Sequence, residues 1–116
     1  MDRKKQERAP FVEALEGYCQ QHLKAYHTPG HKLGQGISAY QASLFGDALR
    51  RDLGVMYALD DLFQPEGALK EAMDLAADLY GAGRTFFSIN GTTACIEAMI
   101  LAVCGDGDEI LIPREA

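Results

Sequence analysis

The sequence predicts an α/β fold in which a helical lead-in is followed by a strand–helix–strand (βαβ) unit of a mostly parallel sheet. Two apolar runs of strand character, residues 85–89 and 109–113, flank a run of strong helix formers at residues 93–103. A helix that crosses between two strands in this way joins parallel strands. Because a parallel sheet is buried on both faces and has more than two strands, we expect the chain to be the N-terminal part of a larger domain.

The first third of the chain is predicted to hold a helix and a shaped loop. Pro10 suits the first turn of a helix, and apolar residues recur with helical spacing over residues 10–23. The string YHTPGHKLGQG follows, and its proline and glycines exclude regular structure. We therefore expect residues 1–36 to form an N-terminal helix with the TPGHK loop, and residues 37–116 to begin a truncated major domain.

Three elements are predicted within residues 37–103. A short helix is expected from Ile37 to Leu49. A longer helix follows Pro65, with apolar residues on one stripe and Gly81 directly after its last residue, Tyr80. The β-branched and aromatic residues 85–89 then suit a buried strand, which leads into the helix at residues 93–103.

Charge and hydropathy exclude several classes of function. The formal net charge of −6 argues against a nucleic-acid-binding surface, which needs clustered basic residues. The one basic cluster, Arg3, Lys4, Lys5 and Arg8, is interrupted by acids and is predicted to be a solvated N-terminal tail. The longest apolar run, residues 98–104, is too short to span a bilayer, so no membrane association is expected.

Three cysteines, Cys19, Cys95 and Cys104, form no CxxC motif and are odd in number. This pattern predicts neither a disulfide framework nor a zinc site, and the cysteines are expected to be small buried apolar residues. No apolar stretch of a secretory signal follows the N-terminal basic residues. We therefore expect a cytoplasmic protein.

The turn Asn90-Gly91-Thr92-Thr93 is the candidate binding site. In a βαβ unit this turn lies at the carboxyl edge of the sheet, where the unpaired N–H groups at a helix start favour an anion. Gly91 lets the backbone approach closely, and the two threonines add hydroxyl donors, so a phosphate would suit this turn. The alternative is that Thr92 or Thr93 only caps the helix. No Walker A string is present, and the one partial dinucleotide fingerprint, at Gly34, follows no strand.

Other polar residues have plainer interpretations. His27 and His31 are separated by Pro29 and Gly30, which break any helix that could align two metal ligands, so no metal site is expected. For His31, a place beside an active-site entrance and a surface or capping role both remain open. Asp60 and Asp61 are expected to be ordinary loop acids, with local hydrogen bonding that organises the LDDLFQPEG turn as the alternative.

Three motifs in register carry a family resemblance: TPGHK, the LDDL…PEGA segment before a helix, and FFSINGTTA before the next helix. From about Phe11 onward the chain resembles the N-terminal part of the ornithine/lysine/arginine decarboxylases. The resemblance implies the major domain of a pyridoxal 5′-phosphate (PLP)-dependent, fold type I enzyme. It also implies that Asn90, Gly91, Thr92 and Thr93 hold the cofactor phosphate, that a small basic amino acid is the substrate, and that the full-length family forms at least dimers.

The same resemblance places the catalytic groups elsewhere. The lysine that holds the cofactor, the acid that pairs with its ring nitrogen and the stacking histidine all match segments beyond Ala116, and Lys32 belongs to the TPGHK loop instead. We therefore assign no catalytic residue and expect the 116-residue chain alone to be inactive. A fragment of another fold type I enzyme, such as an aminotransferase or lyase, and a non-catalytic orphan fragment are the alternatives.

Overall fold

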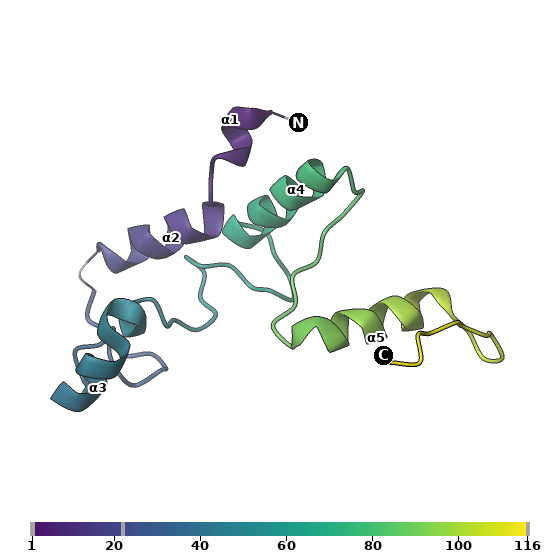
Figure 1. The fold of residues 1–116 in the computed structure, drawn as a ribbon. Helices are drawn as coiled ribbons and strands as arrows, with labels where there is room; N and C mark the ends of the chain where they lie inside the picture. Colours follow the sequence, from purple (N-terminus) through teal and green to yellow (C-terminus); the bar gives the residue numbers. More distant parts are fainter. Residues whose placement is uncertain (1, 22, 116) are drawn as a thin grey trace. The chain divides into compact units, whose positions relative to one another are not determined.

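A computed structural model of the chain describes residues 2–21 and 23–115 (Figure 1). Within these residues the secondary structure is helical, and the backbone forms no β-strand beyond one isolated bridge between Met56 and Asp60. The chain divides into two compact units, Met1–Thr85 and Phe86–Ala116. Each unit is described by itself.

The helices of the first unit include those that the sequence predicts and one, α1, that it does not. They are α1 (Arg3–Gln6), α2 (Pro10–Cys19), α3 (Ala39–Phe45), the 3₁₀ helix η1 (Gly46–Arg50) and α4 (Ala68–Tyr80). The predicted helix at residues 10–23 is confirmed but ends at Cys19, and the predicted helix at residues 37–49 is divided between α3 and η1. The helix after Pro65 ends as expected, because Gly81 adopts a left-handed conformation with φ of 64°.

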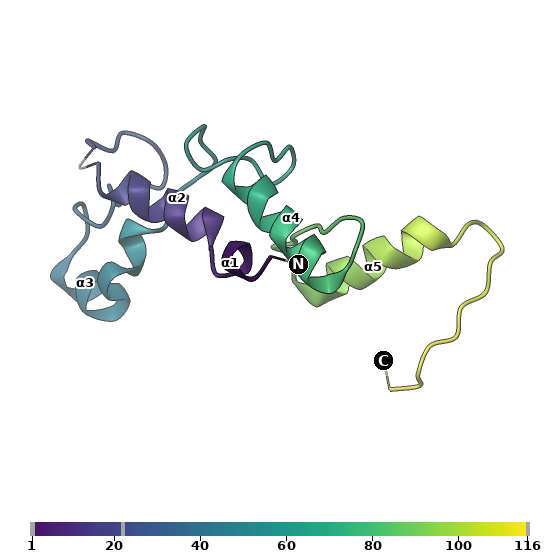
Figure 2. The same ribbon diagram turned by 90° about the horizontal axis from the view of Figure 1, so that it is seen from above.

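A small core forms where α2 packs against α4 (Figure 2). On α2 the buried residues are Pro10 and Cys19, and on α4 they are Met73 and Ala77. Leu59, in the segment before α4, is only 3% exposed. No large side chain among the described residues is completely buried, so this unit has little apolar contact to hold it together.

The N-terminal residues are attached to α4 rather than free. The amide of Gln6 donates hydrogen bonds to the Leu75 carbonyl at 3.0 Å and to a carboxylate oxygen of Asp78 at 3.1 Å. Arg8 forms an ion pair with Glu13 at 2.7 Å and a second one with Glu71. Arg3, Lys4, Lys5 and Arg8 are all exposed, as the prediction of a solvated tail requires. That prediction did not include the contacts of Gln6 and Arg8 with α4, because a sequence pattern does not show these acceptors.

The second unit contains α5 (Gly91–Val103), which begins two residues before the predicted helix start. The two predicted strands, residues 85–89 and 109–113, are not formed in the described residues, so the βαβ unit is not confirmed. A strand requires a paired neighbour and, in a parallel sheet, cover on both faces. Here Ile89 is 80% exposed and Leu111 is fully exposed, so both segments lack that cover.

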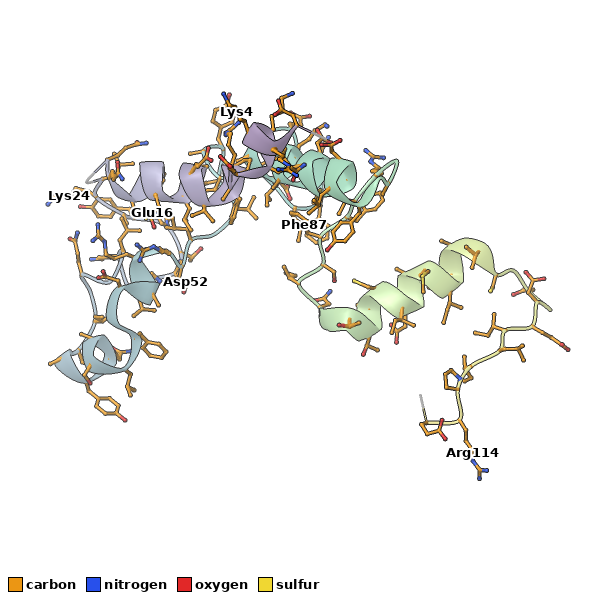
Figure 3. All side chains as sticks on the ribbon, turned by 45° about the horizontal axis from the view of Figure 1, so that its top comes forward. Lys4, Glu16, Lys24, Asp52, Phe87 and Arg114 are labelled. Carbon is orange, nitrogen blue, oxygen red and sulfur yellow. The ribbon has the colours of Figure 1, made fainter. Side chains whose placement is uncertain are left out.

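Helix α5 carries apolar residues on all sides, with Glu97 as its one charged residue. Side chains project from both sides of its ribbon (Figure 3). Ile96, Met99, Leu101 and Val103 are between 48% and 79% exposed. A helix of this composition is typical of one surrounded by other layers of a larger protein. The prediction of three buried cysteines is correct for Cys19 but wrong for Cys95, which lies on this uncovered helix and is exposed. Cys104 is only partly buried.

The helices of the described residues are all too short or too polar to cross a membrane.

Candidate functional site

The four predicted site residues lie together at the start of α5. Asn90 precedes the first helical residue, Gly91, and Thr92 and Thr93 follow in the first turn. All four residues are exposed. The backbone N–H of Asn90 donates to the hydroxyl of Ser88 at 3.2 Å. The side chain of Asn90 makes no capping hydrogen bond to the helix.

The residues of this turn fit an anion such as a phosphate. The first N–H groups of a helix have no partner inside the helix, and here the residue before α5 does not cap them. Gly91 has φ of +78°, and a Cβ atom added there would meet nothing within 4 Å, so the approach to the backbone is open. The first turn of α5 also carries no acidic residue that would repel an anion. The alternative, that Thr92 or Thr93 caps the helix, is wrong, because both residues lie inside the first turn of α5 and Asn90 occupies the capping position.

His27, directly before the TPGHK loop, and His31, within it, both have hydrogen-bond partners nearby. The Tyr18 hydroxyl and His27 Nε2 are 3.2 Å apart, and His27 Nδ1 lies 2.9 Å from the Thr28 carbonyl. His31 Nε2 lies 3.2 Å from a carboxylate oxygen of Asp52, while its Nδ1 accepts a hydrogen bond from Gly34 N–H at 3.3 Å. Both imidazoles thus have local partners, in agreement with the capping alternative for His31.

Lys32 is exposed and has a positive φ of 52°. Its neighbour Leu33 also has a positive φ, 55°, and is buried. Among residues 2–21 and 23–115, no three His, Cys, Asp or Glu side chains lie close enough together to hold a metal ion.

The most extensively bonded carboxylate is that of Asp60. Its two oxygens accept backbone N–H bonds from five residues at 2.8 to 3.3 Å: Asp61, Glu66, Gly67, Leu69 and Lys70. Asp60 thus caps α4, although it lies eight residues before the first helical residue, Ala68. The same carboxylate closes the LDDLFQPEG turn through its bonds to Glu66 and Gly67. Local hydrogen bonding, the alternative interpretation of this acid, is therefore the correct one. Sequence spacing did not identify Asp60 as the cap, because cap patterns place the capping residue directly before the helix.

Electrostatics at Asp60 follow from these bonds. Burial raises the pKa of its carboxyl group, but the N–H donors of Glu66, Asp61, Gly67 and Lys70 outweigh this effect and lower the pKa to about 2. Asp60 is therefore ionised at neutral pH and stabilises the N-terminal end of α4, where the helix dipole favours negative charge.

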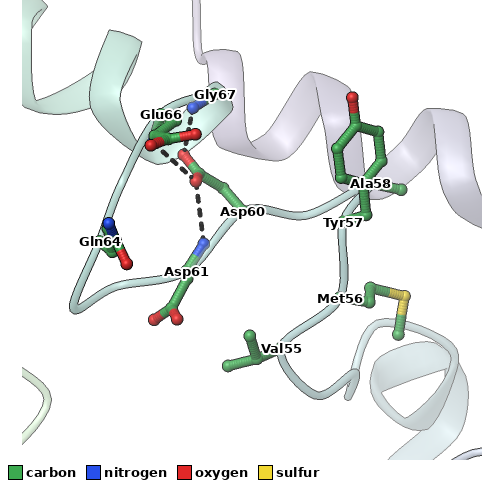
Figure 4. Close-up of a pocket in the computed structure, with 9 residues that line it drawn as sticks. All are labelled: Val55, Met56, Tyr57, Ala58, Asp60, Asp61, Gln64, Glu66 and Gly67. Carbon is green, nitrogen blue, oxygen red and sulfur yellow. Dashed lines mark hydrogen bonds between the residues drawn. The ribbon is translucent and has the colours of Figure 1, made fainter.

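A cavity of about 630 Å³ lies beside this capped turn (Figure 4). Its apolar wall comes from residues 55–58, and its polar wall comes from Asp61, Gln64 and Glu66, next to Asp60 and Gly67. Asp61 accepts a hydrogen bond from the Phe63 N–H at 2.9 Å. Residues 55–58 carry no motif, so this cavity has no signal in the sequence.

Comparison with known proteins defines the class of this chain. Residues 9–116 match the family model of the Orn/Lys/Arg decarboxylase major domain. The chain is 45% identical over 115 residues to an arginine decarboxylase of Bacillus anthracis, a match that covers 98% of this chain. It is 38% identical to the lysine decarboxylase LdcA of Pseudomonas aeruginosa and 35% identical to the inducible ornithine decarboxylase of Escherichia coli, over 90% and 92% of this chain.

The chain therefore belongs to the Orn/Lys/Arg decarboxylase major-domain family, which confirms the resemblance seen in its motifs. It spans 23% of the length of the Bacillus protein and 15% and 16% of the other two. No solved structure matches the chain.

Proposed function

We propose that this chain supplies the phosphate-binding turn of a PLP-dependent decarboxylase of basic amino acids. The observation that carries the proposal is the uncapped, acid-free start of α5, at which Gly91 opens the backbone to an anion. The family membership supports the choice of cofactor and of substrate class. Lysine, ornithine and arginine are the candidate substrates.

The roles of the turn residues follow from their chemistry. The backbone N–H groups at the start of α5 donate to the phosphate oxygens, and the hydroxyls of Thr92 and Thr93 add two donors. Asn90 is the residue directly before α5, at which the chain enters the helix. Bound PLP supplies an electron sink for the carbon that loses its carboxylate. The turn itself binds and orients the cofactor and transfers no proton.

We further propose that residues 85–89 and 109–113 become neighbouring strands when further strands of the protein pair with them and helices cover both faces. Both segments and α5 expose large apolar side chains, among them Phe86 at 73% and Leu101 at 79%. Covering them would remove this apolar surface from water, which favours the buried arrangement. In that arrangement Asn90 to Thr93 would stand at the carboxyl edge of the sheet.

The test uses the full-length protein that carries residues 1–116, together with PLP and each of the three basic amino acids in turn. Release of carbon dioxide from at least one of them is expected. The substitutions Gly91→Val and Thr93→Val should each weaken PLP binding at least tenfold. Gly91→Val blocks access of the phosphate to the backbone N–H groups, and Thr93→Val removes a hydroxyl that donates to the charged phosphate. Equilibrium binding followed by the fluorescence of the bound cofactor measures this effect.

Two controls make the assignment to the phosphate specific. Affinity for pyridoxal, which lacks the phosphate, should be the same in the variants and the unaltered protein. Thr85→Val removes a threonine hydroxyl outside the turn and should leave PLP binding unchanged. If the variants weaken PLP and pyridoxal binding equally, the turn does not bind the phosphate. If the isolated 116-residue polypeptide releases carbon dioxide, it must contain catalytic residues, contrary to our expectation.

A further inference from the structure

We propose that residues 31–36 form a pH-sensitive latch, which the neutral His31 imidazole holds closed and the protonated imidazole releases. The latch includes the last two residues of the TPGHK motif and the four residues after it. It lies within the first unit, Met1–Thr85. The inference does not depend on the proposed function, because it concerns a conformational change of a different segment from the phosphate-binding turn.

Three backbone N–H groups close the latch. Gly34 N–H donates to Nδ1 of His31 at 3.3 Å, and Gly36 N–H donates to the His31 carbonyl at 2.9 Å. Gln35 N–H donates to the Lys32 carbonyl at 3.1 Å. His31 thus accepts two of the three hydrogen bonds, one of them through its ring.

The closed latch has an unfavourable backbone conformation. Lys32, Leu33 and Gly34 are consecutive residues with φ of 52°, 55° and 81°. Glycine adopts this left-handed conformation readily, whereas lysine and leucine adopt it only at a cost. The burial of Leu33, which is 9% exposed, and the hydrogen bonds of His31 offset this cost. Loss of the bond to the His31 ring therefore favours relaxation of the latch.

The hydrogen bonds of His31 determine which ring nitrogen carries the proton. A backbone N–H can only donate, so Nδ1 holds a lone pair, and the proton of the neutral ring lies on Nε2, 3.2 Å from a carboxylate oxygen of Asp52. Protonation adds a hydrogen to Nδ1, which then faces the donor N–H of Gly34. The side chain is only 13% exposed, so the new N–H group reaches an acceptor only if the ring moves. Histidine commonly changes its charge between about pH 5 and pH 8.

The charged groups around the latch do not cancel this effect. Asp52 attracts the protonated ring, but its side chain is 60% exposed, so water and salt screen the pair. This attraction also acts at Nε2 and does not restore the bond to Gly34. The other titratable groups in or beside the latch are Lys32, then Cys19, Asp47 and Arg50, which line the same cavity as Gly34, and Arg51, which is paired with Glu16.

The test measures hydrogen exchange of residues 32–36 in the full-length protein by mass spectrometry, at about pH 8 and about pH 5.5. Protection is the exchange rate of an unstructured peptide of the same sequence divided by the rate in the protein at the same pH. His31→Asn keeps an amide oxygen near the position of Nδ1 that accepts the Gly34 N–H at either pH. His31→Gln places its amide near the position of Nε2 and leaves that N–H without an acceptor. His27→Gln removes the neighbouring histidine and is the control.

In the unaltered protein and in His27→Gln, protection of the latch should fall at least fivefold at the lower pH, while that of α4 changes less than twofold. His31→Asn should keep the same protection within twofold at both pH values, and His31→Gln should show low protection at both. Constant protection in the unaltered protein, or an equal fall in His31→Asn, would overturn the inference. A parallel fall in α4 would also overturn it, because the whole unit would then be unfolding.

If neither His31 variant folds, Asp52→Asn decides. Its amide oxygen still accepts from Nε2 of His31, but the charge of the pair is removed. A fall in protection that persists in Asp52→Asn supports the latch, because the switch then lies at Nδ1. Loss of the fall would place the pH response in the ion pair and overturn the inference.

Discussion

The Oδ2 atom of Asp60 accepts a hydrogen bond from the backbone N–H of Gly67 at 2.8 Å. The residue before α4 thereby has its N–H satisfied by a side chain seven positions earlier in the chain. Gly67 itself has no side chain with which to cap the helix. One carboxylate thus joins the start of α4 to the segment that lines the cavity, and the stability of both depends on it.

Replacement of Asp60 should destabilise the first unit. We expect Asp60→Ala to lower the free energy of unfolding by about 2 kcal/mol, the upper part of the range for the loss of a helix cap. Asp60→Asn should cost less, because Asn keeps one acceptor oxygen and tolerates the positive φ of 73° at this position. Urea denaturation measures both, and hydrogen exchange should accelerate at the N–H groups of Gly67 and Leu69. Equal stability of Asp60→Ala and the unaltered protein would contradict the capping role.

Acid should remove the stabilisation that the ionised Asp60 carboxylate gives to the folded state. The folded-state pKa of Asp60 is lowered from 3.8 to about 2. A group with a depressed folded pKa stabilises the fold fully above its unfolded value, and this contribution is lost as the pH falls from about 4 towards 2. Unfolding midpoints measured across this interval should fall more steeply in the unaltered protein than in Asp60→Asn, which has no proton to bind at this site. Parallel pH profiles for the two proteins would show that another carboxylate is responsible.

The contact between α2 and α4 should depend on Met73. This side chain is one of the two buried residues of α4 and is 7% exposed. We expect Met73→Ala to lower the free energy of unfolding by about 2 kcal/mol. This value is at the lower end of the range for truncation of a buried methionine, because the surrounding core is thin and can partly collapse into the space left. Met99→Ala, at a side chain that is 61% exposed, serves as the control and should cost little. Similar losses for the two substitutions in urea denaturation would be inconsistent with the α2–α4 core.

The end of α4 should be sensitive to the glycine that follows it. Gly81 has φ of +64°, which a residue with a Cβ atom adopts only at a cost. Gly81→Ala is expected to lower the stability by about 1 kcal/mol. Gly83→Ala is the matched control, since a Cβ atom there meets nothing within 4 Å and its φ is not in the left-handed region. A thermal melting midpoint lowered by Gly81→Ala and unchanged by Gly83→Ala would agree with this expectation, and the reverse order would contradict it.

Elements whose causes are local were predictable from the sequence. The apolar stripe and Gly81 together predicted α4 and its end, and strong helix formers predicted α5, which starts two residues earlier than expected. The three motifs in register also identified the decarboxylase family, which the match over residues 9–116 confirms. The cofactor role of Asn90 to Thr93 stays a prediction.

The tertiary structure decided the features that depend on partners distant in the chain. The side chains of Gln6 and Arg8 bind to α4, because this helix, more than sixty positions later in the chain, offers them hydrogen-bond and ion-pair acceptors. Asp60 became a cap because the turn at residues 61–66 folds back and brings the N–H groups of Gly67 and Leu69 to its oxygens. Residues 85–89 and 109–113 have the composition of strands but lack paired neighbours, because a strand, unlike a helix, takes its backbone hydrogen bonds from another segment.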